Sequence, residues 1–205
     1  MLTEKQLKIF EVFAQKPFAE HTRNSIKNES KITSNNMLAA VLNSLKKEEV
    51  IIERKIGRSG IITLNLNNDR TFYYIALCND KKMNKMTKQA LYWLKKEIDD
   101  TPFYSIVIFG SYAINQQKEK SDIDIGIFIE SKEKRKEIEA CVNSAKLKIL
   151  IEADTHVIPY TEMLEMLNNK HENLGKQIAR KHLAAHNHRI FYEIIKEGMN
   201  RGFRL

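Results

Sequence analysis

The chain has 205 residues, of which 42% are hydrophobic and 29% charged, and this composition predicts a globular protein with one large domain or two small ones. Seven Gly and three Pro exclude a collagen-like or proline-rich chain, and no apolar run is long enough to span a bilayer. The formal net charge of +8 is compatible with a polyanionic partner.

The first 67 residues predict three helices followed by a two-stranded ribbon. Thr3 and Gln6 form a capping-box pattern at the start of the first helix, and Ser34 is a favourable N-cap for the third. Two glycines within residues 55–60 form a turn between two β-type runs. The expected elements are helices from Thr3 to about Gln15, over Glu20–Ser30 and from Ser34 through Leu45, then strands over Val50–Ile52 and Ile61–Leu64. This order is typical of a winged helix-turn-helix.

The third helix and the ribbon turn carry the candidate DNA-binding residues. Asn side chains can read the edges of adenine, while Lys and Arg contact phosphates. The exposed side of the helix and the ribbon offer Asn35, Asn36, Asn43, Lys47, Arg54, Lys55 and Arg58. Residues 1–67 hold eight Lys and three Arg against seven Glu, and this excess favours contact with nucleic acid. The alternative is a module for protein–protein contact or dimerisation.

The rest of the chain predicts a mixture of helices and strands. Pro102 ends one helix and leads into a strand, and Asn79–Met86 is rich in Lys and Asn, which indicates a hinge. The expected elements are a short aromatic helix over 72–76, a helix over 87–98, strands over 105–109, 122–129 and 149–158, and helices over 131–146, 161–168, 173–186 and 188–197.

Two carboxylates lie close together in the strand predicted over 122–129. Because strand residues two apart face the same side, Asp122 and Asp124 share one face of the strand. The opposite, core-facing side is formed by Ile123, Ile125, Ile127 and Ile129. Neighbouring carboxylates repel each other, and a bound divalent cation removes the conflict. Hard oxygen ligands suit Mg²⁺, which also takes phosphate oxygens of a substrate.

Gly110 and Ser111 follow the preceding strand, where a helix is expected to begin. Backbone amides at such a turn can bind phosphate, because Gly permits close approach and Ser adds a hydroxyl donor. Together with Ser121, which precedes the Asp pair, they are the candidate nucleotide-binding residues. A phosphate site beside metal-binding carboxylates is what phosphoryl or nucleotidyl transfer requires.

A third carboxylate is expected from the strand predicted over 149–158. Alternation places Glu152, Asp154 and His156 on one face of this strand. Asp154 is the preferred third acid, and Glu152 is the alternative. In a two-metal site this residue can bind the metal nearer the attacking hydroxyl and accept its proton.

Gly110-Ser111, ten intervening residues and then Asp122-x-Asp124 resemble the signature of the DNA polymerase beta-like nucleotidyltransferase superfamily, above all its minimal nucleotidyltransferase branch. With the N-terminal winged helix, the whole chain is similar to prokaryotic, notably archaeal, proteins that join the two domains. The resemblance implies a small mixed sheet with helices and transfer of a nucleoside monophosphate from an NTP with two Mg²⁺ ions, or Mn²⁺ in their place.

The resemblance also implies roles for single residues. Gly110 and Ser111 match the nucleotide-binding turn, Asp122 and Asp124 the metal-binding pair, and Asp154 the third acid. Many members of the family have Arg-Gly where this chain has Ile114-Asn115, and the missing Arg removes a phosphate contact.

The expected fold class is therefore α+β, with a winged helix-turn-helix and connecting helix over 1–80, a nucleotidyltransferase domain over 86–170 and basic helices over 171–205 packed on it. The expected function is Mg²⁺-dependent nucleotidyl transfer to a hydroxyl acceptor, with an NTP and a nucleic acid as partners. The alternative is a DNA-binding transcriptional regulator whose nucleotidyltransferase fold senses nucleotide or serves as a scaffold, or an antitoxin-like partner protein. A homodimer is compatible with either function.

The chain also carries indications of its compartment. Its first residues run into an amphipathic pattern without the apolar core of a signal peptide. Cys78 and Cys141 lie far apart and lack the spacing of a disulfide framework or a metal clip. We therefore expect a cytoplasmic protein that does not contact a membrane.

Overall fold

The computed structural model of the chain describes residues 3–57, 59–98, 103–114, 116–118 and 121–205. The chain divides into two compact units, Met1–Lys81 (unit 1) and Lys82–Leu205 (unit 2). Within the described residues, no helix has the length and apolar character needed to cross a membrane. The helices and the small mixed sheet confirm the expected α+β class.

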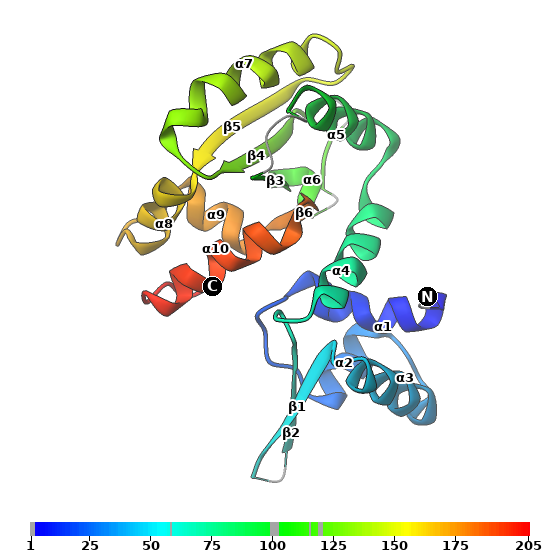
Figure 1. Cartoon of the computed structure of the whole chain (residues 1–205). Helices are drawn as coiled ribbons and strands as arrows, with labels where there is room; N and C mark the ends of the chain where they lie inside the picture. Colours follow the sequence, from blue (N-terminus) through cyan, green and yellow to red (C-terminus); the bar gives the residue numbers. More distant parts are fainter. Residues whose placement is uncertain (1–2, 58, 99–102, 115, 119–120) are drawn as a thin grey trace. The chain divides into compact units, whose positions relative to one another are not determined.

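Unit 1 consists of helices and one antiparallel ribbon (Figure 1). Its elements are α1 (Glu4–Gln15), α2 (Arg23–Ser30), α3 (Asn35–Lys47), β1 (Ile51–Ile56), β2 (Ser59–Leu64) and α4 (Asp69–Lys82). The predicted capping box is confirmed, since the Thr3 side chain accepts from the Gln6 N–H and the Gln6 side chain accepts from the Thr3 N–H. Ser34 caps α3 as expected. The order of these elements up to β2 agrees with the predicted order.

The hinge predicted over 79–86 coincides with the division between the two units, which falls between Lys81 and Lys82, but most of this stretch is helical. Helix α4 continues through Lys82, and α5 begins at Lys85. Phe72, Ile75 and Cys78 are buried at helical spacing, and this apolar stripe stabilises α4 up to the start of the Lys- and Asn-rich stretch. The side chain of Asn84 accepts the Thr87 N–H at 2.8 Å and thereby caps α5.

Unit 2 is built around one four-stranded sheet with the strand order β5-β4-β3-β6. Its elements are α5 (Lys85–Ile98), β3 (Tyr104–Phe109), α6 (Gly110–Ala113), β4 (Ile123–Ile129), the 3-10 helix η1 (Lys132–Lys134), α7 (Arg135–Lys146), β5 (Ala153–Pro159), α8 (Tyr160–Asn168), α9 (Leu174–Arg180), β6 (His182–His186) and α10 (His188–Asn200). β4 and β5 are parallel, while β3 runs antiparallel to both β4 and β6. The sheet is therefore mixed.

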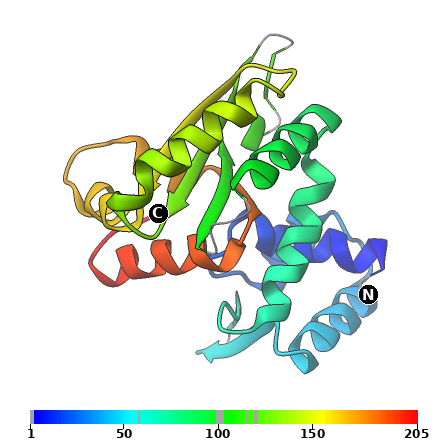
Figure 2. The same ribbon diagram turned by 45° about the horizontal axis from the view of Figure 1, so that its top comes forward.

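Helices cover both faces of this sheet. On one face, α5 and α7 lie side by side over the four isoleucines of β4, which are buried as predicted (Figure 2). On the other face, Phe128 of β4 packs against Phe191 of α10, with 5.2 Å between the ring centroids. Along β4 this second face is partly exposed at Asp124 and buried at Gly126 and Phe128. The buried core thus holds the strands in place, while the start of β4 stays accessible to solvent.

The helix predicted over 173–186 is wrong in its second half. Helix α9 ends at Arg180, and His182–His186 forms β6, which pairs with β3. Leu183 and Ala184 are buried in this strand. Leu and Ala favour a helix by local propensity, but pairing with the otherwise open edge of β3 overrides that preference. The segment 171–205 therefore supplies one strand of the sheet as well as helices.

Two predicted strand boundaries also shift. The strand predicted from Ile149 begins at Ala153, and the strand predicted from Asp122 begins at Ile123. As a consequence, Glu152 and Asp122 lie immediately before their strands.

Candidate functional site

The candidate residues of unit 2 meet at one edge of the sheet, where β3 ends and β4 and β5 begin. Antiparallel pairing places Phe109 of β3 opposite Asp124, and parallel pairing places Asp124 opposite Asp154. Because residues directly opposite in neighbouring strands share a face, the two carboxylates lie on the same side of the sheet. A backbone hydrogen bond of 2.9 Å from the Ile123 N–H to the Glu152 carbonyl joins the starts of β4 and β5.

Gly110 stands directly against Asp124. Its φ of +63° is in the left-handed region, and a Cβ at this position would overlap the carboxylate of Asp124. Only glycine satisfies both requirements without a shift of the backbone or of the carboxylate. The turn after β3 and the first carboxylate of β4 are therefore packed together as one structural feature.

The electrostatics of this edge centre on Asp124. Its pKa is raised above the ordinary Asp value, first by burial and then by the charge of Asp154, with a smaller effect from Asp122. His156 acts in the opposite direction. The His156 ring lies beside Phe109, and its Nε2 is 3.2 Å from Oδ2 of Asp154. The site thus holds carboxylates that repel one another, with a single imidazole in contact.

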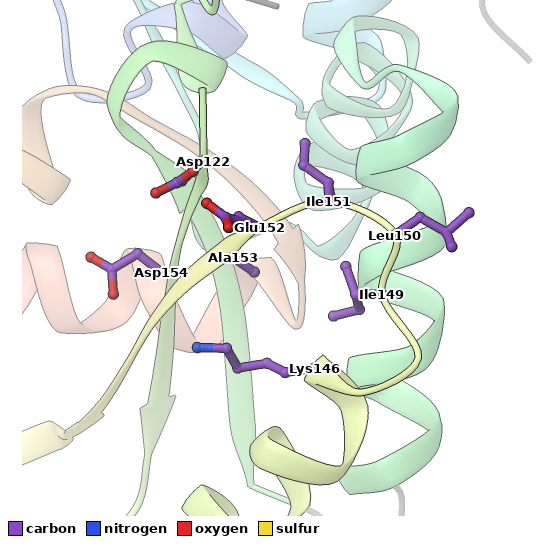
Figure 3. Close-up of a pocket in the computed structure, with 8 residues that line it drawn as sticks. All are labelled: Asp122, Lys146, Ile149, Leu150, Ile151, Glu152, Ala153 and Asp154. Carbon is purple, nitrogen blue, oxygen red and sulfur yellow. The ribbon is translucent and has the colours of Figure 1, made fainter. Parts of the chain in front are cut away.

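A groove of about 560 Å³ opens beside these carboxylates (Figure 3). We call it the carboxylate groove, and its lining residues are Asp122, Lys146, Ile149, Leu150, Ile151, Glu152, Ala153 and Asp154. The acidic side chains come from the starts of β4 and β5, and Lys146 reaches in from the last turn of α7. The volume is within the range of ordinary ligand pockets.

A second groove, of about 620 Å³, shares Asp122, Leu150, Ile151 and Glu152 with the first. Its other lining residues are Asn84, Met86, Tyr112, Gln117, Lys118 and Ser121. The segment that leads into β5 therefore has a groove on either side, and Asp122 and Glu152 are accessible from both.

The two candidates for the third acid have different environments. Asp154 is a residue of β5 in register with Asp124, and its side chain is 58% exposed. Glu152 lies outside the strand and lines the same groove as Asp122. The structure brings both carboxylates to the site, and Asp154 is the one that affects the pKa of Asp124.

The candidate serines belong to the connection between β3 and β4, Ser111 in α6 and Ser121 directly before Asp122. The Ser111 carbonyl accepts the Gln116 N–H at 2.9 Å. The Ser121 hydroxyl accepts the Lys118 N–H at 2.8 Å, and the Ser121 carbonyl accepts the Tyr112 hydroxyl at 3.2 Å. Ser121, directly before Asp122, is therefore hydrogen-bonded to two earlier residues of the same connection. Asn115 lies outside the described residues.

No group of three or more His, Cys, Asp or Glu side chains is arranged to hold a metal ion in the described part of the chain. The carboxylates of Asp122, Asp124 and Asp154 lie at the same edge of the sheet, and carboxylates are hard oxygen donors. Such donors suit Mg²⁺ rather than a soft transition metal.

The candidate DNA-binding residues of unit 1 lie on its surface. Those of α3, namely Asn35, Asn36, Asn43 and Lys47, are exposed. Asn35 Oδ1 accepts from Lys27 Nζ at 2.7 Å, and Arg54 forms an ion pair with Glu20. Lys55 is exposed on β1, and Arg58 lies outside the described residues.

Two residues of the site were not predicted. The sequence places His156 on the face of Asp154, but only the structure shows their contact. Lys146 belongs to a helix between two parallel strands, and the last turn of such a helix points to the start of the second strand. This connection could have identified Lys146 as a residue of the site, but only if β4 and β5 were known to be parallel neighbours.

Comparisons with known proteins locate a family over this unit. A family model described as "Nucleotidyltransferase domain" matches residues 91–202. A search of curated proteins finds no match. Among solved structures, one described as "Crystal structure of the toxin-antitoxin with AMP-PNP" is 17% identical with a TM-score of 0.36, and the match covers 56% of this chain and 85% of that one. The family match includes all four strands of the sheet and so the candidate site.

The packing of Gly110 against Asp124 predicts an energetic coupling between the two positions. Gly110→Ala should destabilise unit 2 through left-handed strain and overlap with the carboxylate, and less so in an Asp124→Ala background, with a coupling of about 1–3 kcal/mol. Denaturant unfolding followed by Trp93, the single tryptophan of the chain, measures it, because Trp93 belongs to α5 of unit 2. Gly202→Ala is the control: its φ is +109° with no atom near a Cβ, so it should show no coupling to Asp124. Equal coupling for both glycines would contradict the packing argument.

The raised pKa of Asp124 predicts a pH-dependent gain in stability when its charge is removed. Between the ordinary Asp value of 3.8 and the raised pKa, the folded state binds more protons than the unfolded state, so wild-type stability falls as pH rises through this interval. Asp124→Asn should therefore be more stable than the wild type at pH 7, and this difference should shrink as pH falls toward 3.8. Unfolding followed by Trp93 across this pH range measures it, with Glu165→Gln on the exposed side of α8 as control. A difference that does not change with pH would be inconsistent with the assigned cause.

Proposed function

The chain belongs to the Nucleotidyltransferase domain family, and on that premise we propose that unit 2 transfers a nucleoside monophosphate from an NTP to a hydroxyl acceptor in the presence of Mg²⁺. The observation that carries this proposal is the grouping of Asp122, Asp124 and Asp154 at one sheet edge beside the Gly110 turn.

The acidic residues fit a divalent cation. Asp124 is held close to Asp154 in spite of the repulsion that raises its pKa, and a divalent cation would relieve that repulsion. Asp122, Asp124 and Asp154 are the residues that would hold it, with Glu152 as the alternative to Asp154. When bound, Mg²⁺ would offset the negative charge of the phosphate groups and favour ionisation of the acceptor hydroxyl.

The protein's own residues would perform the remaining tasks. The backbone N–H groups of the Gly110-Ser111 turn and the Ser111 hydroxyl would donate hydrogen bonds to a phosphate group. Asp154, exposed at the groove, would accept the proton of the acceptor hydroxyl. The acceptor oxygen then bonds to the α-phosphorus of the NTP, the bond from that phosphorus to the β-phosphate oxygen breaks, and pyrophosphate leaves with the electron pair.

Incubation of the full chain with each α-labelled NTP, with and without cell extract as a source of acceptor, tests this reaction. Label should pass to an acceptor in Mg²⁺ or Mn²⁺ and not in EDTA. Asp122→Asn with Asp124→Asn should abolish both the transfer and the gain in NTP affinity that Mg²⁺ provides. Asp154→Asn should lower turnover by about 10²–10⁴ with NTP binding largely kept, because it removes a proton acceptor.

Glu165→Gln is the control for the loss of an exposed carboxylate and should be fully active. If Glu152→Gln abolishes turnover and Asp154→Asn does not, Glu152 is the third acid. Transfer that proceeds equally in EDTA would refute the metal-dependent mechanism.

We also propose that unit 1 is a winged helix-turn-helix that binds duplex DNA. Three helices followed by an antiparallel ribbon support this, together with exposed Asn side chains on α3 and the exposed Lys55 of the ribbon. The same region would serve a transcriptional regulator whose unit 2 senses nucleotide. Either role requires that the ribbon and α3 contact DNA.

Salt-dependent DNA binding by the full chain tests this role. Arg54→Ala with Lys55→Ala should weaken binding to all sequences alike and flatten the plot of log affinity against log salt by about 0.9 for each phosphate that the variant no longer neutralises. Asn35→Ala should instead narrow the gap between preferred and random sequences. Lys5→Ala with Lys8→Ala, two exposed residues of α1, removes the same charge and should leave the slope nearly unchanged. Equal slopes for the two double variants would argue against contact through the ribbon.

A further inference from the structure

The carboxylate groove is lined by one positively charged side chain, Lys146, to which no role has been assigned. Lys146 lines it together with Asp122, Glu152 and Asp154, and its side chain reaches into the groove (Figure 3). Among the residues that the structure describes, none forms an ion pair with Lys146, although three carboxylates line the same groove. The ammonium group is thus available to a ligand.

Neighbouring cations differ from Lys146 in this respect. Lys148 forms an ion pair of 2.6 Å with Glu97, and its Nζ lies 5.2 Å from the centre of the Trp93 ring. Arg135, at the start of α7, contacts Glu162 at 2.9 Å. These cations have partners within unit 2, whereas Lys146 is directed into the groove.

A bound NTP would need positive charge at this place. Three carboxylates against one ammonium make the groove negative, and a triphosphate is itself strongly negative. Lysine is a common phosphate-binding residue because its ammonium is a compact point charge. Building on the proposed function, we infer that Lys146 binds the polyphosphate chain of the nucleotide.

A purely structural role for Lys146 predicts different behaviour. A cation in the last turn of a helix stabilises the helix through its interaction with the helix dipole. That role accounts for a Lys at the end of α7 but not for its direction into the groove. If Lys146 had only this role, its substitution would lower the stability of unit 2 and leave the affinity for phosphate ligands unchanged.

The experiment measures binding of Mg²⁺-tripolyphosphate and Mg²⁺-ATP to the full chain by calorimetry, with adenosine as the ligand without phosphates. Tripolyphosphate carries no base, so its binding reports phosphate contacts alone. Lys146→Met should weaken both phosphate ligands by about tenfold or more, as expected for loss of a charge-assisted hydrogen bond. Lys146→Arg should retain most of the affinity. Lys136→Met, an exposed residue of the same helix, is the matched control and should bind like the wild type.

The outcomes separate two claims, namely phosphate binding by Lys146 and nucleotidyl transfer by unit 2. Unchanged tripolyphosphate affinity in Lys146→Met, or no tripolyphosphate binding by the wild type, overturns the role of Lys146 even if nucleotidyl transfer is observed. Binding that depends on Lys146 in a wild type without transfer activity supports Lys146 and counts against the proposed function. Unfolding followed by Trp93 shows whether Lys146→Met is folded, and Lys146→Arg keeps the test valid if it is not.

Discussion

The repulsion between carboxylates at one edge of the sheet is the constraint on which the organisation of unit 2 depends. Asp124 and Asp154 are direct neighbours in parallel strands, a position that sheets normally avoid for like charges. Their backbones cannot move apart without breaking the β4–β5 ladder. The buried apolar residues farther along both strands, such as Phe128 and Val157, hold that ladder in register. Burial of these apolar residues therefore offsets the unfavourable repulsion between the two carboxylates.

The topology decides which residues share this edge. β3 runs into it, and β4 and β5 run out of it, so the Gly110 turn and the two strand starts meet there. The crossover from β4 to β5 passes through α7, whose last turn then delivers Lys146 to the same edge. Four segments within residues 109–154 contribute, and each contributes at its end.

The sequence predicted the local features of this site and missed those that depend on distant pairing. The spacing of Gly110, Ser111, Asp122 and Asp124 and the buried isoleucine stripe of β4 follow from period-two alternation, which is a local property. β6 could not be found in this way, because its Leu and Ala residues favour a helix until β3 offers an open edge. The composition of 79–86 located the division between the units but not the helical backbone there, since composition says nothing of the apolar stripe that α4 buries.

Several local rules are broken at this one edge, and their coincidence is itself informative. A like-charged pair in register, a left-handed Gly110 in contact with a carboxylate and a lysine directed into a groove each have an ordinary explanation when considered alone. Natural sequences keep such violations few, and those that remain concentrate where binding or chemistry requires them. A cation and a polyanion together would satisfy two of these features, because the cation relieves the repulsion between the carboxylates and the polyanion engages Lys146. No apolar ligand would relieve any of them, so the physical argument favours a metal–polyphosphate pair as the occupant of this edge.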